Sequence, residues 1–208
     1  METFKENLIK KLGEDDFRKL QRVKIGLAGA GGLGSNCALN LVRAGFSRFT
    51  IVDFDVVTEA NLDRQFYFLN QVGISKVDAL KENLIRINPD LDIDTRRERI
   101  EQHNIKALFK DCDIFVECFD KAEYKSMMIE SLLGEGKFIV SVSGLGGIGS
   151  SDEITVHKLK RNLVIIGDLK SDISQKPPIA PRVSIAAAKQ ADVILDYVLK
   201  EDLAIGLR

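Results

Sequence analysis

The strongest fold signal in this chain is the stretch Val23-Lys-Ile-Gly-Leu-Ala-Gly29-Ala-Gly31-Gly32-Leu-Gly34-Ser35. Its first half is a hydrophobic run typical of a buried strand, and a glycine turn leading into a helical pattern follows it. Glycines at such a turn let backbone N–H groups approach a phosphate at a helix N-terminus. The stretch therefore predicts a nucleotide-binding turn made of Gly29, Gly31, Gly32 and Gly34. A glycine kink that only packs helix against sheet is the alternative.

Strand and helix patterns alternate around this stretch. The expected strands cover residues 23–28, 49–52, 93–95, 114–117 and 138–142, and the expected helices cover residues 33–44, 75–88, 104–109 and 121–133. Apolar residues at helical spacing also predict one helix over residues 4–20. This order predicts an α/β fold: a doubly wound, mostly parallel Rossmann-like sheet with helices on both faces.

The pattern changes after residue 142. A glycine-rich segment (144–149) is followed by an alternating strand (153–159), a short strand (163–166), an irregular segment (168–181) and a final helix (183–199). Alternation predicts a C-terminal antiparallel extension. We expect one domain over residues 1–208, divided into an N-terminal helix (1–22), a Rossmann-like core (23–142), and an extension with a crossover loop and C-terminal helix (143–208).

Composition narrows the class of protein. The 208 residues carry a formal net charge of -1, so no global field favours a nucleic acid or a membrane surface. The N-terminus lacks a signal-peptide pattern, and no apolar run approaches the roughly 20 residues of a membrane span. Three cysteines at irregular spacing suit a reducing compartment. These features predict a cytoplasmic protein with neither a nucleic-acid nor a membrane partner.

Two aspartates follow the second expected strand. In open α/β sheets, ligands bind at the carboxyl ends of the strands, and an acidic residue there commonly holds a ribose hydroxyl. Asp53 lies at that end and is the favoured ribose ligand. Asp55 is expected to be a turn residue that accepts hydrogen bonds from nearby backbone N–H groups.

Cations come soon after these aspartates. Arg64 and Lys76 are expected to face the nucleotide, with Asn61 and Gln65 as neutral hydrogen-bonding neighbours. Fixed cations directed at a triphosphate stabilise the charge that develops when pyrophosphate leaves. A solvated surface position is the alternative for either cation, but their place shortly after the expected ribose ligand favours the site.

The segment Glu117-Cys118-Phe119-Asp120 ends another strand at the same sheet edge. A carboxylate there can hold Mg²⁺ against phosphate oxygens, and Asp120 can equally cap the helix expected to begin at residue 121. Position alone favours neither role. Cys118 is a weaker candidate nucleophile. No zinc site is expected, because no CxxC pair occurs and the histidines are poorly spaced.

The chain resembles the ThiF/MoeB/HesA adenylyltransferases, which are bacterial relatives of the ubiquitin-activating enzymes. The motifs that carry the resemblance are, in order, G-x-G-G-L-G-S, V-D-F-D, N-L-x-R-Q, a lysine before a long helix, and C-x-D. This resemblance covers residues 23–142. A later pattern is similar to a shorter, zinc-free subgroup of ThiF-like proteins: Gly167-Asp168-x-x-Ser171-Asp172, then Ala180-Pro181-Arg182-Val183, then Ala186-Ala-Ala-Lys-Gln190-Ala191.

The resemblance implies an activity. Such enzymes bind ATP and Mg²⁺, accept the diglycine C-terminus of a small ubiquitin-like sulfur-carrier protein, and form an acyl-adenylate with release of pyrophosphate. It also implies a homodimer and a role in thiamine biosynthesis or a related sulfur insertion. By motif, Asp53 would hold the ribose, Asn61, Arg64 and Lys76 the phosphates, and Asp120 the Mg²⁺, while Gln65 would line the site. The catalytic residues expected are therefore Arg64, Lys76 and Asp120.

The chain departs from the family pattern in two places. The N-terminal segment whose arginine reaches a partner subunit's ATP is missing, and Arg18 is a weak substitute. The cysteine-bearing crossover loop of larger members is also missing, so no covalent carrier intermediate is expected. Other functions stay open: a non-catalytic nucleotide-binding scaffold, an activator of a small-molecule or RNA-linked carboxylate, and, with less support, an NAD-dependent oxidoreductase.

Overall fold

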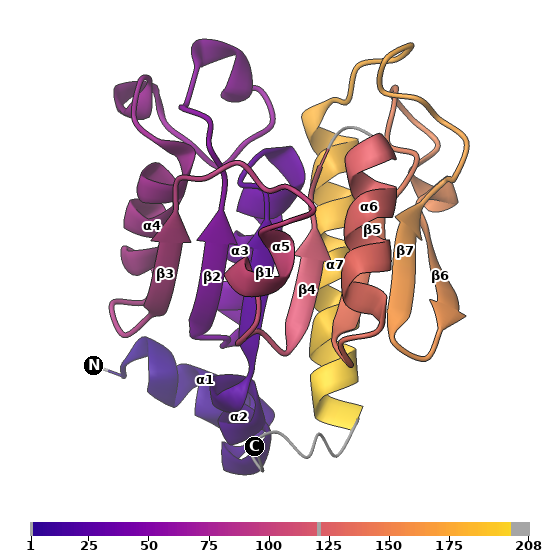
Figure 1. Ribbon diagram of the computed structural model, residues 1–208. Helices are drawn as coiled ribbons and strands as arrows, with labels where there is room; N and C mark the ends of the chain where they lie inside the picture. The colour runs from indigo at the N-terminus through magenta and orange to yellow at the C-terminus, as the bar shows by residue number, and fades with distance from the viewer. Residues whose placement is uncertain (1, 120–121, 201–208) are drawn as a thin grey trace.

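The fold is built on one twisted sheet with helices on both sides (Figure 1). The computed structural model describes residues 2–119 and 122–200. In these residues the sheet has seven strands in the order β3-β2-β1-β4-β5-β7-β6. The strands are β1 (Lys24–Ala28), β2 (Arg48–Val52), β3 (Asp92–Arg96), β4 (Ile114–Glu117), β5 (Phe138–Val142), β6 (Thr155–Lys160) and β7 (Leu163–Gly167).

Every neighbouring pair of strands is parallel except β6 and β7, which are antiparallel. The predicted α/β class and the C-terminal antiparallel extension are therefore confirmed. The extension is smaller than the alternation suggests, because β7 itself runs parallel to β5 and only β6 reverses direction.

The strand order reverses between β1 and β4, which are neighbours in the sheet although residues 29–113 separate them. The chain leaves β1 toward β2 on one side and returns through β4 on the other. Open α/β sheets bind ligands in the crevice at such a reversal, beyond the carboxyl ends of the strands. The glycine turn after β1 and the segment after β4 meet there, and Cys118 N donates to the Ala28 carbonyl over 3.1 Å.

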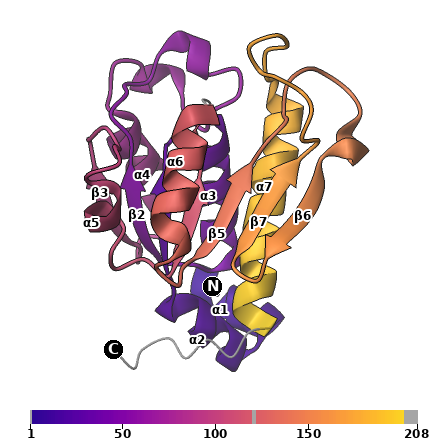
Figure 2. The same cartoon turned by 45° about the vertical axis from the view of Figure 1, so that its right-hand side comes forward.

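Helices cover both faces of the sheet (Figures 1 and 2). Helices α3, α4 and α7 pack on one face and α5 and α6 on the other, as the two hydrophobic clusters of the core show. The helices are α1 (Phe4–Leu12), α2 (Glu14–Arg22), α3 (Gly32–Ala44), α4 (Lys76–Ile85), α5 (Ile105–Leu108), α6 (Ala122–Leu133) and α7 (Ala180–Lys200), with short 3₁₀ turns η1 (Glu59–Asn61), η2 (Leu69–Gln71) and η3 (Ser151–Glu153).

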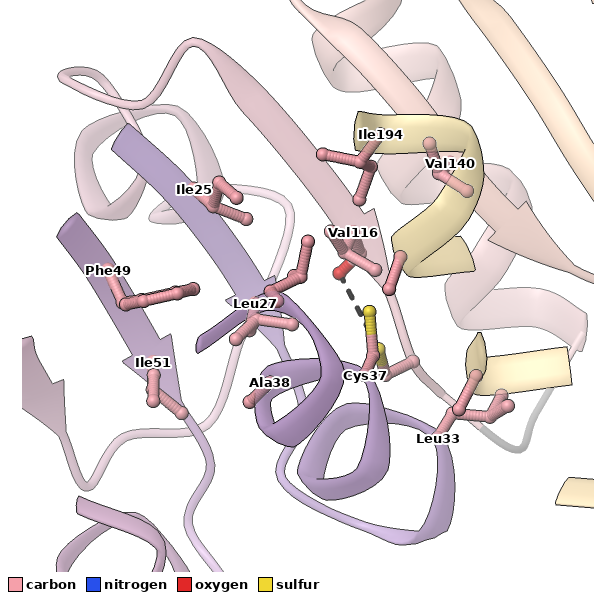
Figure 3. Close-up of a cluster of buried hydrophobic side chains, with 14 of the residues drawn as sticks. Ile25, Leu27, Leu33, Cys37, Ala38, Phe49, Ile51, Val116, Val140 and Ile194 are labelled. Carbon is pink, nitrogen blue, oxygen red and sulfur yellow. Dashed lines mark hydrogen bonds between the residues drawn. The ribbon is translucent and has the colours of Figure 1, made fainter. Parts of the chain in front are cut away.

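The packing of α3 on the sheet positions the glycine turn. Figure 3 shows Cys37 and Ala38 of α3 facing the β-branched and aliphatic side chains of the central strands. Both are fully buried, as are Leu27 and Val116 beneath them. Small side chains on this face of α3 let the helix axis approach the sheet closely, which holds the helix N-terminus over the end of β1.

Several predicted helices have different bounds in the structure. The expected helix over residues 4–20 is two helices, because Gly13 has φ +83° and separates α1 from α2. The apolar spacing continues across this break, since Phe17 and Leu20 of α2 are buried. Helix α4 ends at Ile85 rather than at 88. Pro89 disfavours helical geometry in the residue before it, so the chain has already entered a turn.

Helix α7 begins at Ala180, three residues earlier than predicted, and includes Pro181. Proline is well tolerated in the first turn of a helix, where its missing N–H would have no partner in the helix. The irregular segment between β7 and α7 is therefore shorter than expected. Among the described residues, the helices fall short of the length and apolarity that crossing a bilayer demands.

Candidate functional site

A cleft of about 850 Å³ opens at the carboxyl edge of the sheet, above the reversal between β1 and β4. Its walls come from the glycine turn, the end of β2, the loop before α4, the start of α4, the end of β4, and the loops after β5 and β7. Of the predicted site residues that the structure describes, it brings together Gly29, Gly31, Gly32, Asp53, Asn61, Arg64, Gln65 and Lys76 in this lining. The expected juxtaposition is therefore present.

The glycine turn has the geometry that its sequence predicts. Gly29 has φ +106°, in the region that favours glycine, and its N–H donates to the Val52 carbonyl over 2.9 Å. Gly31 is the N-cap of α3. Gly34 lies beneath the turn rather than in the lining, and a Cβ on it would come within 1.9 Å of the Gly29 carbonyl oxygen. Gly34 thus shapes the turn and has no surface in the cleft.

Asp53 joins the end of β2 to the glycine turn. Its Oδ2 accepts the Ala30 N–H over 2.7 Å, and its Oδ1 accepts the Asp55 N–H over 2.9 Å. Each carboxylate oxygen retains lone-pair capacity for another donor. Asp53 therefore presents a fixed acceptor in the cleft, directly beside the turn.

Asp55 has a role that the sequence did not indicate. The prediction that its side chain accepts backbone N–H groups was wrong, because Asp53 takes that position and Asp55 Oδ2 instead binds Lys76 Nζ over 2.9 Å. The Lys76 side chain is only 8% exposed, whereas Asp55 is 47% exposed. A buried ammonium requires a partner, and Asp55 supplies it from the cleft side of α4.

Arg64 lies at the rim of the cleft. Its Nη1 donates to the Ala60 carbonyl over 3.1 Å and to Asp63 Oδ1 over 2.6 Å. The Arg64 side chain is 28% exposed and that of Asp63 is 58% exposed, so water screens this pair. The guanidinium is therefore held by weak contacts that a phosphate can replace.

The two neutral neighbours differ in their contacts. Asn61 Oδ1 accepts the Thr58 N–H over 3.0 Å and closes η1. Gln65 Oε1 is buried and lacks a hydrogen-bond partner within the described residues. A buried polar oxygen without a partner is costly, and one in a cleft lining is a candidate for ligand contact. Gln65 therefore carries the clearest unmet hydrogen bond of the predicted set.

Tyr67 is a buried residue that supports the cleft and that sequence reasoning missed. Its hydroxyl lies 2.6 Å from the Ala30 carbonyl oxygen and 3.2 Å from the Lys76 carbonyl oxygen and shares its one hydrogen between them, so it ties the glycine turn to the start of α4. Burial, with the nearby charges of Asp53 and Asp55, raises the pKa of Tyr67 above its usual range. The hydroxyl thus stays a donor at neutral pH. No local pattern distinguishes Tyr67 from a core tyrosine.

Asp120, the expected magnesium ligand and third catalytic residue, lies outside the described residues. The segment before it is rigidly held. Glu117 is fully buried, and both of its carboxylate oxygens lie 3.1 Å from Lys125 Nζ. Its Oε2 also accepts a hydrogen bond from the Ser141 hydroxyl, and its Oε1 accepts one from the Phe119 N–H. Lys125 also donates to the Val142 carbonyl. This pair, another that the sequence did not indicate, fixes the ends of β4 and β5 and leaves Glu117 committed to Lys125.

Clustered metal ligands and the Cys118 thiol are the other groups to place. Residues 2–119 and 122–200 bring no three His, Cys, Asp or Glu side chains close enough to hold a metal ion. Burial, with the nearby Cys37 and Glu117, raises the pKa of the Cys118 thiol well above its usual value. Cys118 therefore stays protonated at neutral pH, which disfavours the weaker idea that it is a nucleophile.

An aromatic surface completes one side of the cleft. Phe54 is 44% exposed, and the guanidinium carbon of Arg99 lies 4.2 Å from the centre of its ring. Both residues line the cleft. Exposed aromatic rings stack readily on planar groups, and arginine does the same. The lining thus combines a flat surface, a carboxylate acceptor, backbone amides at a helix start, and cations that include Arg64 and Lys76. This combination suits a nucleotide with several phosphates.

Known proteins share parts of this sequence. The chain is 37% identical over 132 residues to the adenylyltransferase and sulfurtransferase UBA4 of Eremothecium gossypii, covering 63% of this chain and 30% of that protein. It is 31% identical over 179 residues to tRNA threonylcarbamoyladenosine dehydratase 2 of Saccharomyces cerevisiae, covering 84% of this chain and 37% of that protein. The chain thus spans only about a third of the length of these curated relatives.

The fold has a solved counterpart. The crystal structure of E. coli tRNA N6-threonylcarbamoyladenosine dehydratase, TcdA, in complex with ATP superimposes with a TM-score of 0.79 at 19% identity, over 93% of this chain and 91% of that chain. This likeness confirms the predicted architecture. At the level of sequence, the model of the ThiF family matches residues 4–198. That match spans nearly all of the chain, which therefore belongs to the ThiF family.

Proposed function

We propose that this protein is an ATP-dependent adenylyltransferase that activates a carboxylate, specifically the C-terminal diglycine carboxylate of a ubiquitin-like sulfur-carrier protein. The observation that carries the proposal is that Arg64 and Lys76 line the same cleft as the glycine turn and Asp53. Membership of the ThiF family and similarity to a relative named as an adenylyltransferase support it. The pathway we propose is thiamine biosynthesis or a related sulfur insertion, supported by the sequence resemblance alone.

In the proposed reaction, a carboxylate oxygen of the carrier attacks the α-phosphorus of ATP. The new bond from oxygen to phosphorus forms as the bond from the α-phosphorus to the bridging oxygen breaks, and pyrophosphate leaves with that electron pair. Arg64 and Lys76 would stabilise the negative charge that develops on the phosphates. Asp53 would accept a ribose hydroxyl, and Asn61 would orient a phosphate oxygen through its Nδ2 amide. Gln65 would line the site, where its buried Oε1 would accept a hydrogen bond from a ligand N–H or O–H group. Mg²⁺, held by Asp120, would neutralise further charge.

The test is ATP–pyrophosphate exchange by the purified protein with Mg²⁺ and a carrier ending in Gly-Gly. We expect exchange that depends on the carrier, together with an intact-mass gain of one adenylyl group on it. The matched control is the same carrier with its C-terminal carboxylate blocked as an amide, which should abolish both signals. Nucleotide binding without exchange, whatever carboxylate is offered, would instead indicate a non-catalytic scaffold. Tight NADH binding without ATP binding would instead favour an NAD-dependent oxidoreductase.

A second candidate substrate is a carboxylate linked to RNA. It is favoured by the relative whose name places it in tRNA modification, because that match covers more of this chain than the UBA4 match does. The net charge of -1 disfavours it, since phosphate contacts usually need a basic surface. Exchange stimulated by modified tRNA and not by any diglycine carrier would favour this substrate.

Substituting the two aspartates after β2 should affect ATP binding to different extents. Asp53→Asn is expected to weaken ATP binding by about tenfold or more, because hydrogen bonds to a charged group contribute about 1.5–3 kcal/mol. Asp55→Asn should change ATP binding by no more than about fivefold, because the half-exposed Asp55 carboxylate is screened by solvent and asparagine keeps an oxygen that can accept from the buried Lys76. Isothermal titration calorimetry with ATP measures both. A larger loss in Asp55→Asn would reverse the ribose assignment.

We also propose a homodimer, as the family resemblance implies. Arg18, the weak substitute for the missing N-terminal arginine, lies on α2 and pairs with Glu14 over 2.7 Å. Helix α2 leads directly into the start of β1, at the end of the sheet opposite the cleft (Figure 1). Arg18 therefore does not serve the cleft of its own chain, so in the proposed homodimer it could act only on a second copy.

A further inference from the structure

A buried tyrosine joins two parts of the cleft that belong to different elements. Tyr67 is 5% exposed and is not part of the described lining of the cleft. Its hydroxyl oxygen lies 2.6 Å from the Ala30 carbonyl oxygen, in the glycine turn, and 3.2 Å from the Lys76 carbonyl oxygen, at the start of α4. Ala30 is the nearer acceptor and takes the larger share of the hydroxyl hydrogen. Tyr67 therefore holds the turn from its buried side.

The Ala30 carbonyl shares a peptide unit with the Gly31 N–H. This peptide bond is trans, so its C=O and N–H bonds point in opposite directions. A hydroxyl that holds the carbonyl on the buried side therefore turns the Gly31 N–H outward. Gly31 lines the cleft, and within residues 2–119 and 122–200 its N–H makes no hydrogen bond. The Gly31 N–H is thus a donor directed at the cleft and available to a ligand.

Ala30 is held through both of its backbone groups. Its N–H donates to Asp53 Oδ2 over 2.7 Å, and its carbonyl accepts from Tyr67. With both groups committed, Ala30 cannot rotate without breaking a hydrogen bond. The bond to the carbonyl also polarises the peptide, which strengthens the N–H at its other end as a donor. The direction of the Gly31 N–H is therefore set before a ligand arrives.

Tyr67 lies on a loop that is itself firmly anchored. The Tyr67 N–H donates to the Gln65 carbonyl over 2.8 Å, and the Phe66 N–H donates to Ser35 Oγ over 3.0 Å. Ser35 is fully buried in the first turn of α3, and its hydroxyl donates to the Gly31 carbonyl over 2.7 Å. The tyrosine hydroxyl is therefore a fixed point against which the turn is placed.

We propose that Tyr67 is a positioning residue for phosphate binding, because it aims the Gly31 N–H at a phosphate of the bound nucleotide and fixes the turn relative to the start of α4. This role rests on the proposed function only in that a nucleotide must bind in the cleft, and it applies whichever carboxylate is activated. Tyr67 acts through one backbone donor. Its loss should therefore weaken the binding of the phosphates and spare the rest of the nucleotide.

Tyr67→Phe removes only the hydroxyl. We expect the Kd for ATP to rise about five- to tenfold, because a misdirected N–H loses part of what a hydrogen bond to a charged group contributes. The Kd for adenosine, which has no phosphate, should stay within about twofold. Competition against a fluorescent ATP analogue measures both. Tyr197→Phe is the matched control, because it removes the same atom from a tyrosine that stacks on Phe138 at the opposite end of the sheet; both Kd values should match wild type.

A second set of variants tests the route through Gly31. Gly31→Pro removes the N–H itself, and its φ of -78° lies within the range of proline. A Cβ there would meet only Gln65 Nε2, at 3.9 Å. Gly31→Pro should weaken ATP binding at least as much as Tyr67→Phe, and adding Tyr67→Phe to it should change the ATP Kd by less than about twofold, because residues that act through one contact are not additive. In Gly31→Ala, which keeps the N–H, Tyr67→Phe should retain its full effect.

Equal rises in the ATP and adenosine Kd values of Tyr67→Phe, or no change in either, would make Tyr67 a structural residue and leave the proposed function standing. A full additional loss from Tyr67→Phe in the Gly31→Pro background would overturn the route through Gly31. If Gly31→Pro does not fold, the two Kd values of Tyr67→Phe still decide. Failure of the wild type to bind ATP would overturn the proposed function and this role together.

Discussion

Arg64→Ala is expected to slow ATP–pyrophosphate exchange by about 100-fold or more, with little loss of stability. Removing one donor that stabilises transition-state charge typically costs about 2.7–4 kcal/mol in the rate. In the described structure the Arg64 guanidinium donates to the Ala60 carbonyl and to the exposed Asp63, so deleting the side chain breaks a weakly held, solvent-screened pair. The exchange rate at saturating ATP, and the melting temperature, measure the two effects separately.

Two companion variants sharpen this test. Arg64→Lys keeps the charge but loses the bidentate fork, and it should recover only part of the rate. Arg48→Ala is the control, because Arg48 is a 44% exposed arginine at the start of β2, where it pairs with Asp92 far from the cleft end of the strand. Its exchange rate should match wild type. Exchange by Arg64→Ala within twofold of wild type would remove the strongest support for the adenylyltransferase.

The layout of this cleft was predictable from sequence for a physical reason. Parallel strands end at a common edge, so residues that directly follow β1, β2 and β4 must gather there once the alternation of strand and helix is recognised. Gly29 and Asp53 both directly follow a strand, and the Ala30 N–H to Asp53 hydrogen bond shows them in contact. The prediction needed only strand ends and no knowledge of side-chain conformation.

Which side chains pair with one another was harder to predict from the sequence. Asp55 and Asp53 are two residues apart in a loop, and which one meets Lys76 depends on how the chain turns after β2. The buried ion pair between Asp168 and Arg182 depends on where α7 begins, and the position of Pro181 made that start seem later than it is. Periodicity identifies elements that bury apolar surface, but it carries no information on the direction of a turn outside them.

Gly34→Ala should destabilise the protein by about 3 kcal/mol and abolish ATP binding. Overpacking a well-packed site costs typically about 1–3 kcal/mol, and this site is at the severe end because the new Cβ would lie 1.9 Å from the backbone oxygen of Gly29. Neither atom belongs to a flexible side chain, so relief requires the glycine turn to open or α3 to move off β1. For a chain of this size, the loss corresponds to a fall in melting temperature of roughly 6–12 °C.

The chain offers a matched control at Gly134, which follows α6, has no positive φ, and has open space within 4 Å of the position that a Cβ would take. Gly134→Ala should therefore unfold at the wild-type temperature and bind ATP normally, although the chemical change is the same. If Gly34→Ala keeps wild-type stability, the tight turn between β1 and α3 is wrong. Opening the turn must displace the backbone amides that would cradle the phosphates. If Gly34→Ala loses stability but binds ATP as wild type does, the turn therefore supports the fold and does not hold the nucleotide.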